Sequence, residues 1–196
     1  VRQNEQRKTQ RLAMESVYAM LKQHPATRLY HGQTIRALIN IIDRSNMTTE
    51  GFKFDKTAFV IEWVKRDLLN IAFGNSDNHG RNTAFLRDET TIWLSPIYDF
   101  APMKADPEGI ARSMIWQNDN GQTLELGGRY DFIAICESLS DLIEPSILLE
   151  ELKQTAEKLV DLPNRLQQRG VSEKILSHPA IAFDYLPKRL QDWGLI

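Results

Sequence analysis

The side chains best able to do chemistry in this sequence lie in one short polar stretch and in one acid downstream of it. Residues 75–82 read Asn-Ser-Asp-Asn-His-Gly-Arg-Asn, so Asn82 follows Asp77 by five positions, and Asp99 comes after an apolar segment. A magnesium-dependent phosphotransferase needs such a set, because one acid orients the attacking hydroxyl while an amide and a second acid hold the metal on the phosphates. Magnesium is a hard cation that prefers these oxygens. The pattern therefore favours phosphoryl transfer.

A buried helix is predicted to provide the base for this stretch. Residues 56–73 carry apolar side chains three and four positions apart, and Asp55 is a suitable N-cap. A helix that is apolar over so much of its circumference is mostly buried. The polar loop that follows, residues 74–82, is therefore expected to start from a rigid support.

A hairpin is predicted to connect the two parts of the motif. Residues 83–86 and 91–94 read as two short strands around a polar turn. The second strand returns the chain towards the start of the first, so Asp99 is expected to lie near Asn82. Three oxygen-bearing side chains would then converge on one metal ion.

The remaining chain reads as a helical body, and the fold class predicted is mainly α (α+β) with a small β insert. A second hairpin is expected from residues 114–116 and 123–126, around the Asn120-Gly121 pair. Further helices are predicted over residues 12–24, 35–46, 131–139, 145–168 with a bend at Pro163, and 179–193.

Composition narrows the class of protein. The 196 residues suit one domain or one lobe, and 24 Lys and Arg against 26 Asp and Glu give no general attraction to polyanions. The single cysteine, Cys136, excludes an internal disulfide and is expected to be a small buried hydrophobe. No apolar run approaches a membrane span and the start lacks the apolar core of a signal peptide, so a cytoplasmic protein is expected.

Two motifs together resemble one known family. Residues 74–82 (Gly-Asn-x-Asp-x-His-x-x-Asn) followed by residues 94–99 (Leu-Ser-Pro-x-Tyr-Asp) resemble the HipA family of bacterial serine/threonine kinases. The resemblance implies the helical C-lobe of an atypical protein-kinase-like fold, with a small β-hairpin insert carrying the catalytic residues. It also implies ATP and magnesium as cofactors.

The resemblance implies a role for each polar side chain. Asp77 would be the catalytic acid/base, and Asn82 and Asp99 would be the magnesium ligands. His79 would brace the loop or meet the phosphates. Arg81 stands where lysine is expected in many relatives, and its planar guanidinium makes a phosphate role less direct.

The resemblance also implies partners and a missing part. Relatives are toxins that are restrained by a helix-turn-helix antitoxin, and known members phosphorylate aminoacyl-tRNA synthetases. Contact with DNA is expected only through the antitoxin, and no contact with a membrane is expected. Neither a glycine-rich phosphate loop nor a strand lysine with a partner glutamate can be identified here. Residues 1–196 are therefore expected to be the C-terminal lobe without the N-terminal ATP-binding lobe, with no appreciable kinase activity in isolation.

Three other interpretations remain open from the residues themselves. Asp, Asn and Gly also cluster in ordinary turns, which explains Asp77 and Asn82 equally well until Asp99 is added. A lipid or small-molecule kinase could use the same machinery, since Asp99-Phe100-Ala101 is close to Asp-Phe-Gly. A non-catalytic module that binds an antitoxin or its operator complex is the third.

Overall fold

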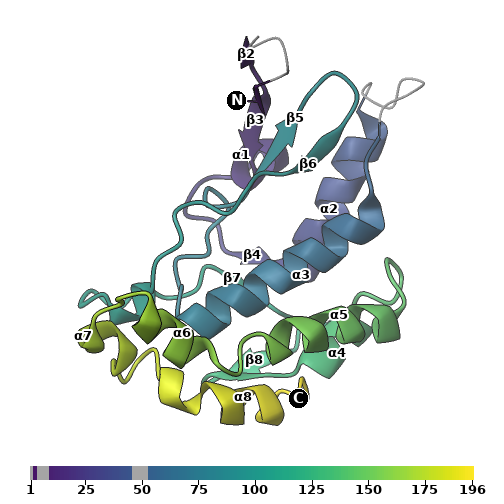
Figure 1. The fold of residues 1–196 in the computed structure, drawn as a ribbon. Helices are drawn as coiled ribbons and strands as arrows, with labels where there is room; N and C mark the ends of the chain where they lie inside the picture. Colours follow the sequence, from purple (N-terminus) through teal and green to yellow (C-terminus); the bar gives the residue numbers. More distant parts are fainter. Residues whose placement is uncertain (1, 4–8, 46–52) are drawn as a thin grey trace.

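The longest helix, α3 (Lys56–Phe73), runs through the middle of the molecule (Figure 1). The structure is a computed structural model that describes residues 2–3, 9–45 and 53–196. The helix begins where the Asp55 carboxylate accepts a hydrogen bond from the Ala58 amide (2.9 Å), and it ends at Gly74, whose φ of 71° only glycine adopts freely. Both end signals are local in the sequence, which explains why these bounds match the predicted ones.

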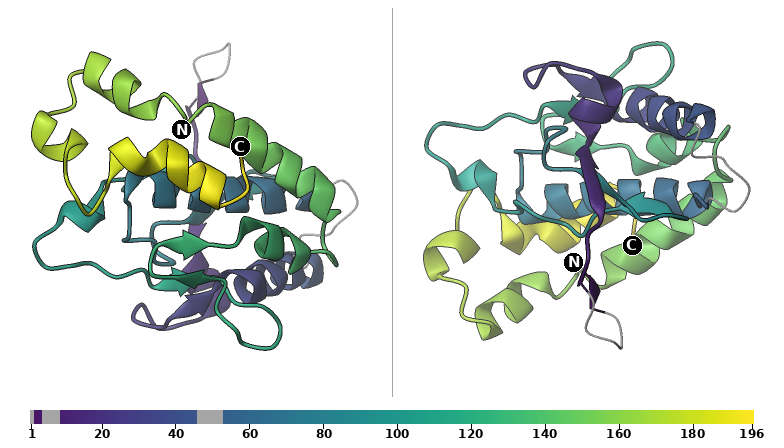
Figure 2. Two further views of the ribbon diagram at one scale, coloured as in Figure 1. Left: turned by 90° about the horizontal axis from the view of Figure 1, so that it is seen from below. Right: turned by 90° about the horizontal axis from the view of Figure 1, so that it is seen from above.

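Shorter helices cover α3 on two sides. Figure 2 shows α5 and α8 lying in front of α3 when the molecule is seen from below, while α2 lies along the other side. The helices besides α3 are α1 (Val17–Leu21), α2 (His31–Arg44), α4 (Phe132–Glu137), α5 (Pro145–Glu157), α6 (Leu162–Gln168), α7 (Glu173–Leu176) and α8 (Leu186–Asp192), with 3-10 turns η1 (Met103–Ala105) and η2 (Phe183–Tyr185).

The strands form small separate sheets. The largest is antiparallel, in the order β3 (Ala13–Ser16), β5 (Ala84–Arg87) and β6 (Ile92–Leu94). The other pairs are parallel β4 (Leu29–Tyr30) with β7 (Met114–Ile115), antiparallel β8 (Glu125–Leu126) with β9 (Arg129–Tyr130), and antiparallel β1 (Arg2–Gln3) with β2 (Thr9–Gln10). The fold is therefore α+β and mainly helical, as predicted.

One hydrophobic core joins these layers. Leu68 from α3, Phe85 from β5, Trp116 after β7 and Phe132 from α4 are all fully buried within it. Cys136 is also buried, at 2 % exposure, and burial raises the pKa of its thiol to about 12. Within the ranges that the structure describes, no helix is both long and apolar enough to cross a bilayer.

The predicted central elements are confirmed. The helix of residues 56–73, its Asp55 cap and the first hairpin, seen as β5 and β6, match the structure. The second amphipathic stripe forms α2, which ends at Arg44; the predicted end at Asn46 falls outside the described residues.

The prediction of a helix over residues 12–24 was wrong for its first half. Residues 13–16 form the edge strand β3, which pairs along β5, and only Val17–Leu21 are helical. The Ser16 hydroxyl accepts a hydrogen bond from the Ala19 amide and starts this short helix. Pairing with a strand about 70 residues away decides the conformation, and local periodicity does not register that partner.

Two further predictions need correction. The second hairpin forms close to its turn, where Gln117 bridges Thr123 and the Leu124 amide donates to the Trp116 carbonyl (3.0 Å), but it does not extend over the full predicted strands, since β7 pairs with β4 and β8 pairs with β9. The predicted helix of residues 145–168 is broken at residues 158–161, because Pro163 lies in the first turn of a new helix, α6, where its missing N–H is tolerated. At the C-terminal end, η2 and α8 are shorter than the predicted helix, and α7 was not predicted.

Candidate functional site

The polar loop, residues 74–82, begins where α3 ends. The Asn75 amide donates to the Asn70 carbonyl (2.8 Å), and its side-chain Nδ2 donates to Asn70 Oδ1 (2.9 Å). The Gly74 carbonyl accepts a hydrogen bond from the Lys104 amide (2.9 Å). The start of the loop is therefore fixed both to its own helix and to the segment that follows Asp99.

The far end of the loop packs against α1. The Gly80 carbonyl accepts from the Tyr18 amide (3.2 Å), and the Thr83 carbonyl accepts from the Val17 amide (3.0 Å). A Cβ atom at position 80 would lie 3.1 Å from the Tyr18 ring, so a larger residue there would force the ring to shift by a few tenths of an ångström.

Asn78 holds the middle of the loop and was not predicted to have a role. Its Nδ2 donates to the Met114 carbonyl (2.8 Å), while its Oδ1 accepts from the amides of Ser113 (3.1 Å) and Met114 (3.2 Å). The residue is 6 % exposed. An asparagine in a polar loop is too common to signal this contact, because the partner segment lies more than 30 residues away in the chain.

Asp77 and Asn82 are brought together as the spacing predicted. Asn82 Nδ2 donates to the Asp77 carbonyl (3.0 Å), and the Asn82 amide donates to the His79 carbonyl (2.9 Å). The first bond fixes which way the Asn82 amide points and leaves its Oδ1 available to another ligand. The Asp77 side chain is about one-third exposed, at 32 %, so solvent or substrate can reach it.

His79 lies beside the Asp77 carboxylate. Its Nε2 is 3.6 Å from Asp77 Oδ1, and its ring centroid is 6.4 Å from that of Tyr18. In the part of the chain that the structure describes, its buried Nδ1 has no hydrogen-bond partner. The ring can therefore support Asp77 from one side.

The segment that carries Asp99 meets the loop through Tyr98. The Tyr98 hydroxyl donates to the Arg81 carbonyl, and its pKa is raised by burial and by the nearby Asp99 charge. Asp99 itself is exposed, with a left-handed φ of 51°. Among the described residues no hydrogen bond or ion pair joins Asp99 to Asp77 or Asn82, so its approach to them is only indirect, through Tyr98.

A small polar pocket lies where these segments meet. Its volume is about 30 Å³, close to the share of one water molecule in the liquid, so it suits a water or a small ion rather than a nucleotide. Its lining comes from α3, the polar loop and the segment after β6: Arg66, Asn70, Asn75, Asp77, Asn78, Asn82, Thr83, Ile97, Tyr98 and Phe100. Asp77 and Asn82 thus face one cavity, although Asp99 does not line it.

A second polar cluster, the buried charge network, lies behind β7. We define it as His31, Asp67, Arg112, Trp116 and Glu125. Arg112 Nη2 donates to both carboxylate oxygens of Asp67 (3.1 and 2.8 Å), and Trp116 Nε1 donates to Asp67 Oδ2 (2.8 Å). Arg112 also binds Glu125 through Nε (3.0 Å) and Nη2 (3.2 Å).

The charges of this network are set by burial and by each other. Burial lowers the pKa of His31 to about 4, so its ring is neutral at pH 7. Because Trp63 Nε1 donates to His31 Nδ1 (2.9 Å), the ring proton of His31 is on Nε2, which lies 3.4 Å from Asp67 Oδ2. Burial opposes the charge of Asp67, but Arg112 outweighs it and lowers the pKa to about 2. The network was missed in the sequence, although Asp67 is a charge on the apolar stripe of the central helix, between Val64 and Ile71.

Comparisons with known proteins were made for the whole chain. Residues 2–162 match the family model described as HipA-like C-terminal domain. Among solved structures, HipA from Shewanella oneidensis MR-1, in the complex of that toxin–antitoxin system's HipA, HipB and operator DNA, matches with a TM-score of 0.60 and 14 % sequence identity. The match covers 94 % of this chain but only 44 % of the HipA chain, so this chain spans less than half of that protein. No curated protein matches.

Proposed function

Because this chain belongs to the HipA-like C-terminal domain family, we propose that it is the C-terminal lobe of a serine/threonine protein kinase. The complete protein would transfer the γ-phosphoryl group of ATP to a hydroxyl of a protein. The observation that carries the proposal is the shared pocket: Asn82 is bonded to the Asp77 backbone, and both residues line one small cavity. The atypical kinase-like lobe and its hairpin insert belong to the same proposal.

Asp77 is the residue proposed to orient the attacking hydroxyl and to accept its proton. Its partial exposure lets a substrate reach the carboxylate, while the bond from Asn82 and the ties of Asn78 fix its backbone. His79 would support Asp77 from the side, and Arg81, which is exposed, would meet a phosphate group.

The donor types suit a magnesium ion, although Asp99 does not line the pocket that Asp77 and Asn82 share. The orientation of the Asn82 amide leaves its Oδ1 free to bind an ion. The Asp99 carboxylate is exposed, and its charge, together with burial, raises the pKa of the Tyr98 hydroxyl. Asn82 and Asp99 would hold the ion, and a bound magnesium would neutralise the charge on the phosphates. Asp99 keeps a left-handed backbone that costs of the order of 1 kcal/mol, a cost often found at functional sites.

The proposed partners follow from the same relationship. The matched HipA was solved with HipB and operator DNA, which supports a helix-turn-helix antitoxin as a partner and contact with DNA through it. A protein substrate, such as an aminoacyl-tRNA synthetase, and a cytoplasmic location are proposed with it.

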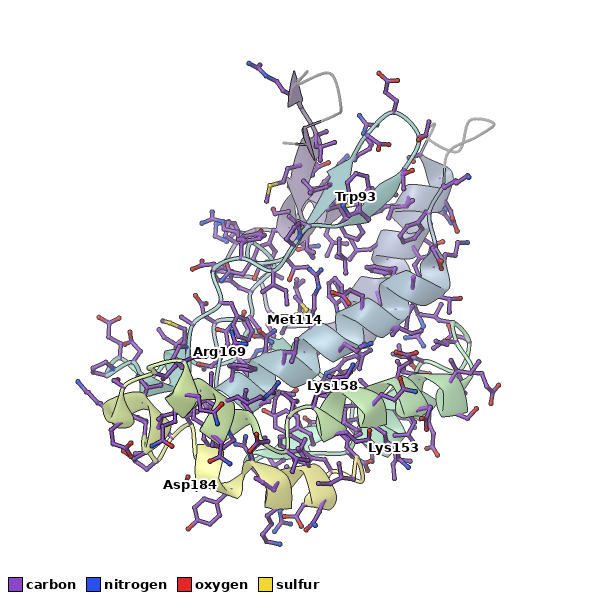
Figure 3. All side chains as sticks on the ribbon, in the orientation of Figure 1. Trp93, Met114, Lys153, Lys158, Arg169 and Asp184 are labelled. Atoms are coloured by element: carbon purple, nitrogen blue, oxygen red, sulfur yellow. The ribbon has the colours of Figure 1, made fainter. Side chains whose placement is uncertain are left out.

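The test is the substitution Asp77→Asn in the complete protein. Since a positioned base contributes roughly 10² to 10⁴ in rate, we expect transfer of labelled phosphate from ATP to protein to fall by about that factor, and a magnesium chelator to abolish it in the unmodified protein. Asp184→Asn is the matched control, because Asp184 is exposed on η2, distant from the polar loop in the sequence and labelled in Figure 3. An undiminished rate in Asp77→Asn would contradict the role of Asp77.

Two further measurements separate the alternative functions. Mass spectrometry of the phosphorylated products distinguishes protein from lipid or small-molecule substrates. Calorimetry with magnesium and ATP should give no heat of binding if the complete protein is a non-catalytic module that only binds an antitoxin.

A further inference from the structure

The side chain of Asn78 connects the polar loop to strand β7. Asn78 stands between Asp77 and His79 in the sequence, and its side chain is buried. The side-chain amide of Asn78 both donates hydrogen bonds to and accepts them from the backbone of residues 113–114. This set of bonds imitates the pairing of one strand with another. The middle of the loop therefore takes its position from β7.

Strand β7 is itself fixed to the central helix. Arg112, just before the strand, and Trp116, just after it, both donate to Asp67, which is 1 % exposed on α3. On its other edge β7 pairs with β4. The two residues that Asn78 binds, Ser113 and Met114, thus lie between two residues bonded to Asp67.

The loop's other ties lie towards its ends. Gly74 and Gly80 are bound through their backbone carbonyls, and Asn82 bonds within the loop. Asn78 is adjacent to the proposed catalytic acid, so its bonds to β7 fix the backbone next to Asp77, in addition to the bond from Asn82 to the Asp77 carbonyl.

We propose that Asn78 is a positioning residue, which transmits the rigidity of the Asp67–Arg112 pair through β7 to the Asp77 carboxylate. The inference rests on the proposed function. It assigns to the buried charge network a part in aligning the site, in addition to its part in stability.

The effect should appear in the chemical step rather than in nucleotide binding. A displacement of about 1 Å in a reacting group can cost about 10²-fold in rate. Asn78→Ala leaves Asn82 and Asp99 unchanged, so we expect kcat for phosphoryl transfer by the complete protein to fall by about 10- to 100-fold, with KM for ATP changed by less than about twofold.

The experiment pairs this variant with Asn118→Ala. Asn118 also accepts two backbone N–H bonds through Oδ1, from Asn120 and Gln122, and donates one through Nδ2, but it does so in a turn remote from the polar loop in the sequence. Asn118→Ala should leave kcat unchanged. Hydrogen exchange measured on the same proteins should show faster exchange of residues 75–82 in Asn78→Ala only, with α3 still protected.

The outcomes distinguish this inference from the proposed function. If the unmodified complete protein transfers phosphate and Asn78→Ala keeps its kcat, the positioning role is overturned. If the unmodified protein transfers no phosphate, the proposed function fails. In that case, unchanged hydrogen exchange of residues 75–82 in Asn78→Ala would also overturn the structural role of Asn78, whereas faster exchange would support that role. Should Asn78→Ala not fold, Trp116→Phe removes one donor to Asp67 and should produce the same loop-specific change in exchange; its absence would count against the inference.

Discussion

Two polar regions lie on either side of β7, and they differ in how their charges are satisfied. In the buried charge network, Arg112 is bonded to both Asp67 and Glu125, and His31 is kept neutral. In the polar loop and the segment after β6, the side chains of Asp77 and Asp99 are accessible to solvent, and Asp77 Oδ1 lies 3.6 Å from His79 Nε2. Among the described residues, Arg112 Nη1 is the one buried side-chain atom of this network without a hydrogen-bond partner, so nearly all of its polar groups are satisfied internally. Accessible oxygens, rather than the number of charges, therefore mark a candidate binding site.

The same substitution in both regions should have very different effects on stability. Asp67→Ala leaves Arg112 buried without its main partner, and we expect the free energy of unfolding to fall by about 3–5 kcal/mol. Asp77→Ala removes an accessible carboxylate and should cost less than about 1 kcal/mol. Urea unfolding of the two variants and the unmodified chain measures the difference in the free energy of unfolding. Comparable losses in the two variants would contradict the proposed contrast between a network held by internal bonds and an accessible loop.

Acid should destabilise the fold through the buried charge network. The folded pKa of His31 is lowered from 6.5 to about 4, so between these values the unfolded chain binds a proton that the folded chain does not, and stability falls as the pH drops. The loss should reach about 3 kcal/mol near pH 4. Asp67, lowered from 3.8 to about 2, adds a further loss as the pH falls below about 4.

The variant His31→Gln isolates this effect. Glutamine does not titrate, so the loss of stability between pH 6.5 and 4 should shrink in urea unfolding curves taken across that range. His24→Gln, at an exposed position, is the control and should leave the pH dependence as it is. An identical pH profile for His31→Gln and the unmodified chain would show that His31 is not the titrating group.

The smallest difference in stability between two compared variants is expected at Asn82. Asn82→Ala removes one hydrogen bond to the Asp77 backbone and should cost about 1 kcal/mol, similar to Asn164→Ala, which removes one exposed bond to Asp161. The two variants should differ in function, because only Asn82→Ala should raise the magnesium concentration needed for phosphoryl transfer by the complete protein. If Asn82→Ala and Asn164→Ala needed the same magnesium concentration, Asn82 would not be a magnesium ligand.

The parts of the fold that the sequence predicts are those with local signals. The central helix has a cap at Asp55, a stop at Gly74 and a regular apolar stripe between them, and all three are within one segment. The interval from Asp77 to Asn82 also lies within one loop, so their contact could be predicted from spacing.

The remaining parts depend on distant partners. Strand β3 exists because β5 is available to pair with it, and β7 pairs with β4, so the predicted second hairpin is confined to residues 116–124. Asn78 acquires its role from residues 35 and 36 positions away, and Arg112 acquires its role from Asp67, 45 positions away on α3; no local pattern encodes these contacts. The sequence thus predicts the contact between Asn82 and Asp77 better than the way in which the loop is held.

The buried thiol of Cys136 gives this chain an internal reporter. Thiolate is the form that reacts with alkylating reagents, and a thiol with a pKa raised to about 12 in the core stays unlabelled while α4 remains packed. Its rate of alkylation therefore counts complete openings of the helical body, independently of any event at residues 74–82. A ligand that slows this alkylation must stabilise the whole fold.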